Sequence, residues 1–128
     1  MAKVGKFCLA KRVKVAWLFH FTGDLIISEG VTTIGNKAFL DCIGFSGKLI
    51  IPESVIIIED GAFWKCNFKN VYCKAITPPQ LERLSFGFDV FSNPSEKTLY
   101  VPVGSKDAYL NAEGWKDFKF KEIVEMQF

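Results

Sequence analysis

The sequence has few of the features that mark membrane proteins or nucleic-acid-binding proteins. No apolar run approaches the roughly 20 residues that a membrane-spanning helix needs. The formal net charge is only +2, and the basic cluster at Lys11, Arg12 and Lys14 is far smaller than the basic face that binds a phosphate backbone. We therefore predict no membrane span and no nucleic-acid partner, and we interpret the basic cluster as solvated.

Histidine is nearly absent and the cysteines are widely spaced, which argues against a catalytic or metal site. His20 is the only histidine, and the four cysteines, at positions 8, 42, 66 and 73, form no CxxC pair of the kind that binds zinc. Nucleophilic catalysis needs a base within hydrogen-bond reach of a serine or cysteine. We therefore predict that the protein is not an enzyme, that it uses no cofactor or metal, and that His20 is structural.

A secretory leader is also missing. Residues 1–6 carry positive charge, but the apolar segment of about 7 to 15 residues that a signal peptide needs does not follow them. Two alternatives remain open at this point: the protein is cytosolic, or the leader of an exported protein is absent from this chain.

What the sequence does contain is an internal repeat. The segment that begins at Gly23, GDLIISEGVTTIGNKAFLDC, aligns without a gap with the segment that begins at Gly47, GKLIIPESVIIIEDGAFWKC, and ten of the twenty positions are identical. A weaker third unit begins at residues 69–74 and resumes at residues 88–93, and a partial fourth unit occupies residues 98–102. A period of this length predicts a solenoid in which each repeat forms one coil.

Each repeat combines a short strand, a second extended segment and a turn. Leu25 and Ile27 alternate with their neighbours in the period of two that is typical of a strand. Residues 31–34 and 55–58 predict the second extended segment, and Asn36 or Asp60 is the expected cap of a single helical turn that carries Ala-Phe. Stacked coils then predict three interior ladders. Their members are Leu25, Leu49, Val71 and Leu99; Ile27, Ile51, Cys73 and Val101; and Phe39, Phe63 and Phe91.

The fold class that follows is a mainly β repeat solenoid with parallel strands and few single-turn helices, capped at both ends. Residues 1–22 are the expected N-terminal cap with its strand, residues 23–103 the coils, three and a partial fourth, and residues 104–128 a C-terminal cap of helix and strand. In that last part, Ser105 is the expected N-cap of a helix at residues 106–110. The predicted apolar cover of the last coil consists of Trp115, Phe118, Phe120, Ile123 and Val124.

In its motifs, the repeat resembles the BspA-like leucine-rich repeats of surface proteins from Bacteroidetes and other mucosal microbes. The family unit, a strand ending in Ile-Pro followed by Val-x-x-Ile-Gly-x-x-Ala-Phe-x-x-Cys, is matched by residues 51–52 and by residues 31–42. Residues 98–124 also resemble the family's terminal cap. The sequence departs from the pattern at Glu59, which replaces a glycine, and at residues 75–88, which lack a clean second strand.

The resemblance implies a right-handed leucine-rich-repeat coil and a role in adhesion or protein recognition. It implies a location at the cell surface or outside the cell, with a cytoplasmic location left open. The expected partner is a protein, such as a host or extracellular-matrix protein. A structural or oligomerisation unit of a larger surface assembly is the alternative function.

The predicted binding site lies on the outward side of the first strands. If Leu25 and Ile27 point inward, the residue between them and its equivalents point outward. Polar flanks surround this apolar row, as expected of a patch that binds a protein ligand or forms a homodimer. The binding residues are predicted to be Ile26, Ile50, Tyr72, Tyr100, Lys48 and Lys74; further flanking positions are Asp24, Asn70, Thr98, Ser28, Pro52 and Pro102. Strand propensity alone, or cover by residues 75–88, is the competing interpretation.

Two kinds of residue that recur at the same place in both repeats have structural explanations. Glu29 and Glu53 recur after the strand and could form a carboxylate pair, but a solvated turn explains them. Cys42 and Cys66 recur beside the Ala-Phe turn, where a free cysteine packs as a small apolar residue. A disulfide is the alternative for the cysteines, and Cys66 and Cys73 are the pair nearest in sequence.

Overall fold

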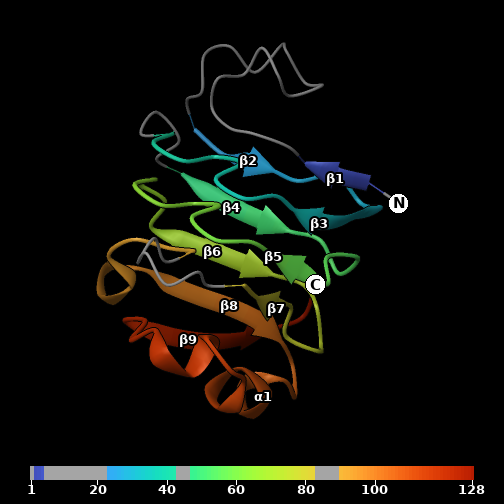
Figure 1. Ribbon diagram of the computed structural model, residues 1–128. Helices are drawn as coiled ribbons and strands as arrows, with labels where there is room; N and C mark the ends of the chain where they lie inside the picture. Colours follow the sequence, from blue (N-terminus) through green and yellow to red (C-terminus); the bar gives the residue numbers. More distant parts are fainter. Residues whose placement is uncertain (1, 5–22, 43–46, 83–89) are drawn as a thin grey trace.

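The chain winds into stacked coils whose strands form two parallel sheets (Figure 1). The computed structural model describes residues 2–4, 23–42, 47–82 and 90–128. One sheet has the order β2-β4-β6-β8-β9 and the other the order β1-β3-β5-β7. The strands are β1 (Ala2–Val4), β2 (Leu25–Ile26), β3 (Val31–Ile34), β4 (Lys48–Ile51), β5 (Ile57–Ile58), β6 (Asn70–Cys73), β7 (Gln80–Leu81), β8 (Thr98–Pro102) and β9 (Glu122–Met126). The predicted repeat solenoid of parallel strands is confirmed.

The five-stranded sheet has the register that the repeat predicted. Leu25 pairs with Leu49, Leu49 with Val71, and Val71 with Leu99, and these four side chains are at most 2% exposed. Burial of one such aliphatic side chain stabilises a fold by roughly 1.5 to 3 kcal/mol. Equivalent residues therefore form an apolar ladder because each coil buries its inner side only against its neighbours.

The four-stranded sheet contains a strand that the sequence pattern did not reveal. Residues 75–88 were expected to lack a second strand, yet β7 pairs in parallel with β5, with Ile58 opposite Leu81. The Gln80 N–H donates to the Ile56 carbonyl at 2.8 Å, and the Glu82 N–H donates to the Ile58 carbonyl at 2.9 Å. A strand of two residues, one of them polar, shows no alternation, so backbone pairing with the previous coil defines it.

The third side of each coil is a turn that stacks phenylalanines. Phe63 lies between Phe39 and Phe91, with both pairs of ring centroids 5.6 Å apart and the planes within 8°. The predicted phenylalanine ladder is therefore confirmed. The expected single helical turn is wrong, because residues 36–41 form hydrogen-bonded turns in which Lys37 and Asp41 adopt positive φ.

Hydrogen bonds between coils replace the predicted helix caps on this side. The N–H groups of Lys37 and Phe39 donate to the carbonyls of Asp60 and Ala62 in the next coil. The carboxylate of Glu59 accepts a hydrogen bond from the Asn36 N–H at 2.8 Å. The departure from the family glycine at Glu59 thus supplies an acceptor to the preceding coil.

The C-terminal residues form three short helices and a last strand. The short helices are η3 (Pro94–Glu96), α1 (Lys106–Asn111) and η4 (Trp115–Asp117), and β9 then pairs in parallel with β8. Ser105 is the N-cap residue of α1, but its hydroxyl donates to the Pro102 carbonyl at 2.6 Å and makes no capping bond to the helix. The expected capping bond is therefore wrong, although the helix begins where predicted.

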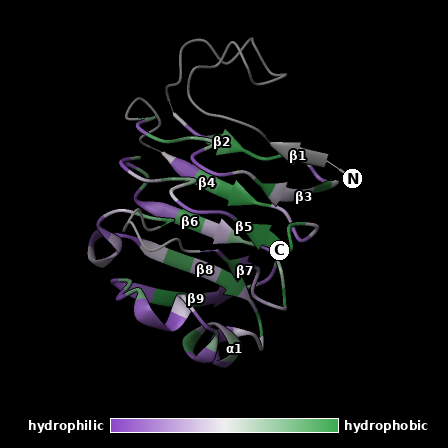
Figure 2. Cartoon of the chain, in the orientation of Figure 1, coloured by the Kyte–Doolittle hydropathy of each residue, from purple (hydrophilic) through white to green (hydrophobic). Residues whose placement is uncertain are grey.

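Two aromatic side chains anchor this cap to the third coil. The Tyr109 hydroxyl donates to the Ala75 carbonyl at 2.6 Å, and the Trp115 indole donates to the Pro79 carbonyl at 2.7 Å. Both residues are buried. Figure 2 shows that hydrophobic residues concentrate in the strands, while hydrophilic residues dominate many of the turns that connect them.

Much of the predicted N-terminal cap lies outside the described residues. These undescribed positions include Cys8, His20 and the basic cluster at Lys11. Within the described part, β1 pairs in parallel with β3, and Val4 lies opposite Ile34. A strand at the very start of the chain thus extends the four-stranded sheet.

Candidate functional site

The outward residues of the five-stranded sheet form one continuous row. Ile26 pairs with Ile50, Ile50 with Tyr72, and Tyr72 with Tyr100. The structure adds Val124 of β9, which lies opposite Tyr100. We call these five residues the outward row. The sequence predicted its register in the repeats but assigned Val124 to the apolar cover, because β9 lies outside the repeat.

Exposure along the outward row is greatest at its first member. Ile26 is 65% exposed, whereas the other four residues are partly exposed. Neighbouring parallel strands lie about 4.8 Å apart, so the row crosses the whole sheet as an almost unbroken apolar and aromatic strip. Strips of this kind are uncommon on isolated monomers.

Tyr72 and Tyr100 form a stacked pair at the centre of the strip. Their ring centroids are 4.3 Å apart and the planes differ by 7°. The Tyr100 hydroxyl donates to Asn70 Oδ1 at 3.4 Å. Partial burial, and then the neighbouring Tyr72, raise the pKa of the Tyr100 phenol above its ordinary value. The hydroxyl thus remains protonated to a higher pH than that of a free tyrosine, and it donates to Asn70.

The two predicted lysines lie at opposite ends of their strands. Lys48, at the start of β4, is exposed, and its Nζ lies 5.7 Å from the centroid of the Tyr72 ring, within the range of a cation–π contact. Lys74 directly follows β6 and is half-buried, with its N–H bonded to the Ile51 carbonyl. The structure thus brings Lys48 onto the aromatic pair and leaves Lys74 on the rim.

One of the surface positions that the sequence predicted beside the outward row is buried in the structure. Asp24 and Ser28 are exposed, as expected, but Pro52 is buried. The side chain of Asp24 is also committed within the fold, since its Oδ1 accepts a hydrogen bond from the Lys48 N–H at 2.8 Å. Pro52 is therefore removed from the set of flanking surface positions.

One residue of the site was missed because it lies beyond the repeat. The Phe128 ring packs edge-on against the Tyr72 ring, with centroids 6.5 Å apart and planes at 78°. Phe128 is 48% exposed. No periodicity links the two residues, so the sequence carries no signal for this contact.

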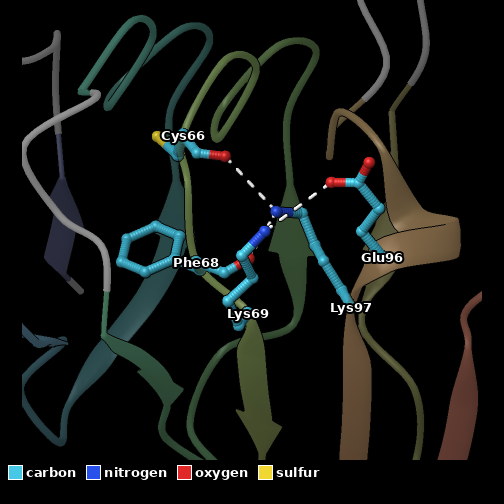
Figure 3. Close-up of polar contacts among 5 residues, drawn as sticks. All are labelled: Cys66, Phe68, Lys69, Glu96 and Lys97. Carbon is cyan, nitrogen blue, oxygen red and sulfur yellow. Dashed lines mark hydrogen bonds and ion pairs between the residues drawn. The ribbon is translucent and has the colours of Figure 1, made fainter.

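A buried lysine, Lys97, was also missed. It is only 4% exposed, and its amine donates to the carbonyls of Cys66, at 3.3 Å, and Phe68. Figure 3 shows this amine pointing at the backbone of the 66–68 segment, while Lys69 reaches Glu96 in an exposed ion pair of 3.6 Å. Burial lowers the pKa of the Lys97 ammonium. The Lys97 amine thus supplies hydrogen bonds to backbone carbonyls in the connection that leads from the phenylalanine turn to β6.

The cysteines differ in their bonding. Cys66 and Cys73 are buried and free, so they form no bridge with each other. The Cys66 thiol donates to the Phe39 carbonyl at 2.9 Å, and Cys73 Sγ lies 3.2 Å from the Tyr109 hydroxyl oxygen. Burial raises the pKa of the Cys66 thiol to about 12 and that of Cys73 to about 11. Cys42 is also buried, but it is disulfide-bonded. For this cysteine the disulfide, given above as the alternative to a free thiol, is therefore the outcome.

The acidic pair that recurs after the first strands is solvated. Glu29 and Glu53 are both exposed. Ser54, beside them, connects the coils instead, since its hydroxyl accepts from the Gly30 N–H and donates to the Val31 carbonyl. Among the described residues, no group of three or more His, Cys, Asp or Glu side chains is placed to hold a metal ion. The described helices include none with the length and hydropathy of a membrane span.

Comparison with known families identifies the repeat. A family model described as a BspA type leucine rich repeat region matches residues 20–103 in six copies. This match covers well over half of the chain and includes β2 to β8. No curated protein matches the chain.

Proposed function

Because the chain belongs to the BspA-type leucine-rich-repeat family, we propose that it is a non-enzymatic recognition module of a bacterial cell-surface or secreted protein and binds a protein ligand through the outward row. Leucine-rich repeats are generally protein-interaction modules, which supports a protein partner. The adhesive role, the surface location and the binding residues are the further steps of this proposal.

The outward row is the observation that carries the proposal. Five neighbouring strands each contribute one apolar or aromatic side chain to it. Interfaces are enriched in aromatic residues, and tyrosine is frequent among the side chains that dominate binding energy. Lys48 and the Tyr100 hydroxyl add polar groups beside the aromatic pair. The row therefore combines an apolar centre with hydrogen-bonding groups at its margin.

The backbone beneath the row favours binding because it is already ordered. Four of the five row residues lie between inward neighbours that belong to the buried core, such as Leu49 and Ile51 on either side of Ile50. A surface held in this way loses little conformational entropy when a partner docks. A rigid strand face is thus better suited to recognition than an exposed loop of similar composition.

Two isoleucines of similar exposure test the proposal. Ile26, in the row, is 65% exposed, and Ile56, which precedes β5 on the other sheet, is 61% exposed. We expect Ile26→Ala and Tyr72→Ala to weaken binding to immobilised extracellular-matrix proteins by about tenfold or more, as for residues that contribute strongly to an interface. Ile56→Ala is the matched control and is expected to bind like the wild type.

The measurement is surface plasmon resonance over a panel of such proteins, accompanied by light scattering. Equal losses in Ile26→Ala and Ile56→Ala would exclude the outward row as the binding face. A stable dimer that Tyr72→Ala dissociates, together with no binding to the panel, would favour the oligomerisation unit instead. Antibody labelling of intact native cells tests the surface location.

A further inference from the structure

The segment after β9 returns to the centre of the outward row. Met126, the last residue of β9, lies opposite Pro102 of β8. Phe128 lies only two residues further, yet its ring contacts Tyr72 of β6, on the far side of β8. Two strand spacings, about 10 Å, separate β9 from β6. Figure 1 accordingly shows the chain leaving β9 and ending near the end of β6.

Tyr72 is enclosed by three different contacts. Tyr100 stacks on its ring at 4.3 Å, the Lys48 amine lies 5.7 Å from the ring centroid, and Phe128 packs edge-on at 6.5 Å. The first two belong to neighbouring strands of the sheet and are part of the surface itself. Phe128 alone lies outside the paired strands, so its removal opens the ring without altering the register of the strands.

The strand that carries this segment is paired along its whole length, whereas Phe128 lies beyond the last paired residue. All five residues of β9 pair with β8, and Glu125 Oε2 accepts the Lys106 N–H at 2.9 Å. Phe128, in contrast, remains 48% exposed. Loop segments outside paired strands move on the nanosecond to microsecond timescale when few contacts hold them. A pivot after Met126 is therefore enough to release Phe128 while the sheet stays intact.

We propose that Phe128 is an intramolecular latch that occupies Tyr72 and must leave before a partner can use the centre of the outward row. This inference rests on the proposed function of the row. Phe128 also indicates which chemistry the position accepts, namely an aromatic side chain packed edge-on against Tyr72. A protein partner that presents such a side chain would replace Phe128 and hold the latch open.

A small aromatic anion tests the latch without a known ligand. The probe is 8-anilinonaphthalene-1-sulfonate, followed by its fluorescence, because it combines an apolar aromatic system with a charge that suits Lys48. Apparent affinity is reduced by the fraction of molecules that are open, so a latch open in about a fifth of the molecules predicts about a fivefold tighter binding in Phe128→Ala. Gln127→Ala keeps the ring and is expected to bind like the wild type.

Two further measurements make the result specific. Proton NMR is expected to show a change in the Tyr72 ring resonances in Phe128→Ala and none in Gln127→Ala. The double variant Phe128→Ala/Tyr72→Ala is expected to lose the gain in probe binding. Unchanged probe affinity in Phe128→Ala, or a gain that persists without Tyr72, would overturn the latch.

The latch and the proposed function fail in different ways. If Phe128→Ala binds the probe more tightly but neither form binds any matrix protein, the latch stands and the adhesive function is rejected. If the wild type binds a matrix protein through the row and Phe128→Ala binds it with the same affinity, the latch is rejected and the function stands.

Discussion

Tyr72 and Tyr100 stack face to face across β6 and β8, with ring centroids 4.3 Å apart and planes that differ by only 7°. The strands place them directly opposite each other. Because the ring faces cover each other, the pair presents ring edges and hydroxyls to a partner. The same pair forms the centre of the proposed recognition face and the contact point of the proposed latch.

A double-mutant cycle on this pair is expected to show a small coupling. Cross-strand aromatic pairs contribute roughly 0.2 to 1 kcal/mol, so Tyr72→Ala and Tyr100→Ala are each expected to lower the free energy of unfolding only modestly, with a coupling in that range. Urea denaturation of the wild type, both single variants and the double variant measures it. A coupling of several kcal/mol would mean that the tyrosines belong to the core and not to an accessible surface.

Phe63→Ala is expected to destabilise the protein far more. The ring is 1% exposed and stacks on both Phe39 and Phe91. Removing a buried phenylalanine ring leaves a cavity and costs about 3 to 5 kcal/mol. Phe63→Leu is the control that keeps most of the volume, and it is expected to lose less. A free energy of unfolding near the wild-type value in Phe63→Ala would contradict the stacked ladder.

Lys97→Met is expected to lower the free energy of unfolding by about 1 to 3 kcal/mol, the range for buried acceptors that lose their donor. The carbonyls of Cys66 and Phe68 would no longer receive the amine. Lys69→Met is the matched control, because Lys69 forms an exposed ion pair with Glu96. Exposed pairs contribute at most about 1 kcal/mol. Equal effects of the two substitutions in urea denaturation would refute the structural role of Lys97.

Alkaline pH is expected to destabilise the protein through its buried thiols. Burial raises the pKa of the Cys73 thiol from 9.0 to about 11. Such a group contributes its stability in full below the unfolded pKa, and the contribution is lost as pH rises through the folded pKa. The free energy of unfolding is therefore expected to fall between pH 9 and pH 11, with a contribution from Cys73 on the order of 2 to 3 kcal/mol.

Cys73→Ser provides the comparison for this pH effect. Lys97, whose pKa is lowered on folding, acts in the opposite sense in alkaline solution, so the difference between variants isolates the thiol. Serine keeps a polar atom beside the Tyr109 hydroxyl and does not titrate in this range. Urea denaturation of both proteins across the range is expected to show a shallower decline in Cys73→Ser. Parallel pH profiles would exclude the thiol as the cause.

The repeat explains why the coil register was predictable and other contacts were not. Leu25 and Leu49 occupy the same place in two aligned segments, and stacked coils turn that alignment into a contact between neighbouring strands. The two residues of β7 carry no such alignment, and the capping bond of Ser105 was expected from residue type alone. Backbone pairing with β5 and the Pro102 carbonyl decided those two cases.

The candidate site likewise contains residues that the sequence predicted and residues that only the structure revealed. Ile26, Ile50, Tyr72 and Tyr100 follow from strand alternation, and their outward register was predicted. Val124 and Phe128 join them from outside the repeat, and Lys97 is buried although lysine is usually solvated. Val124 joins the row because β9 pairs with β8, whereas the positions of Phe128 and Lys97 depend on segments outside the strands.

The amino-acid sequence by itself determined the solenoid, its family, its interior ladders and four of the five residues that share its outward row. It could do so because identical positions in a repeat meet only their equivalents in the next coil, so that order along the chain becomes order in space. Only the tertiary structure decided that Phe128 reaches Tyr72 and that Lys97 supplies hydrogen bonds to the 66–68 segment. Those contacts join segments that do not share the repeat. The path of the chain after β9 determines the first contact, and the need of buried polar groups for hydrogen-bond partners determines the second.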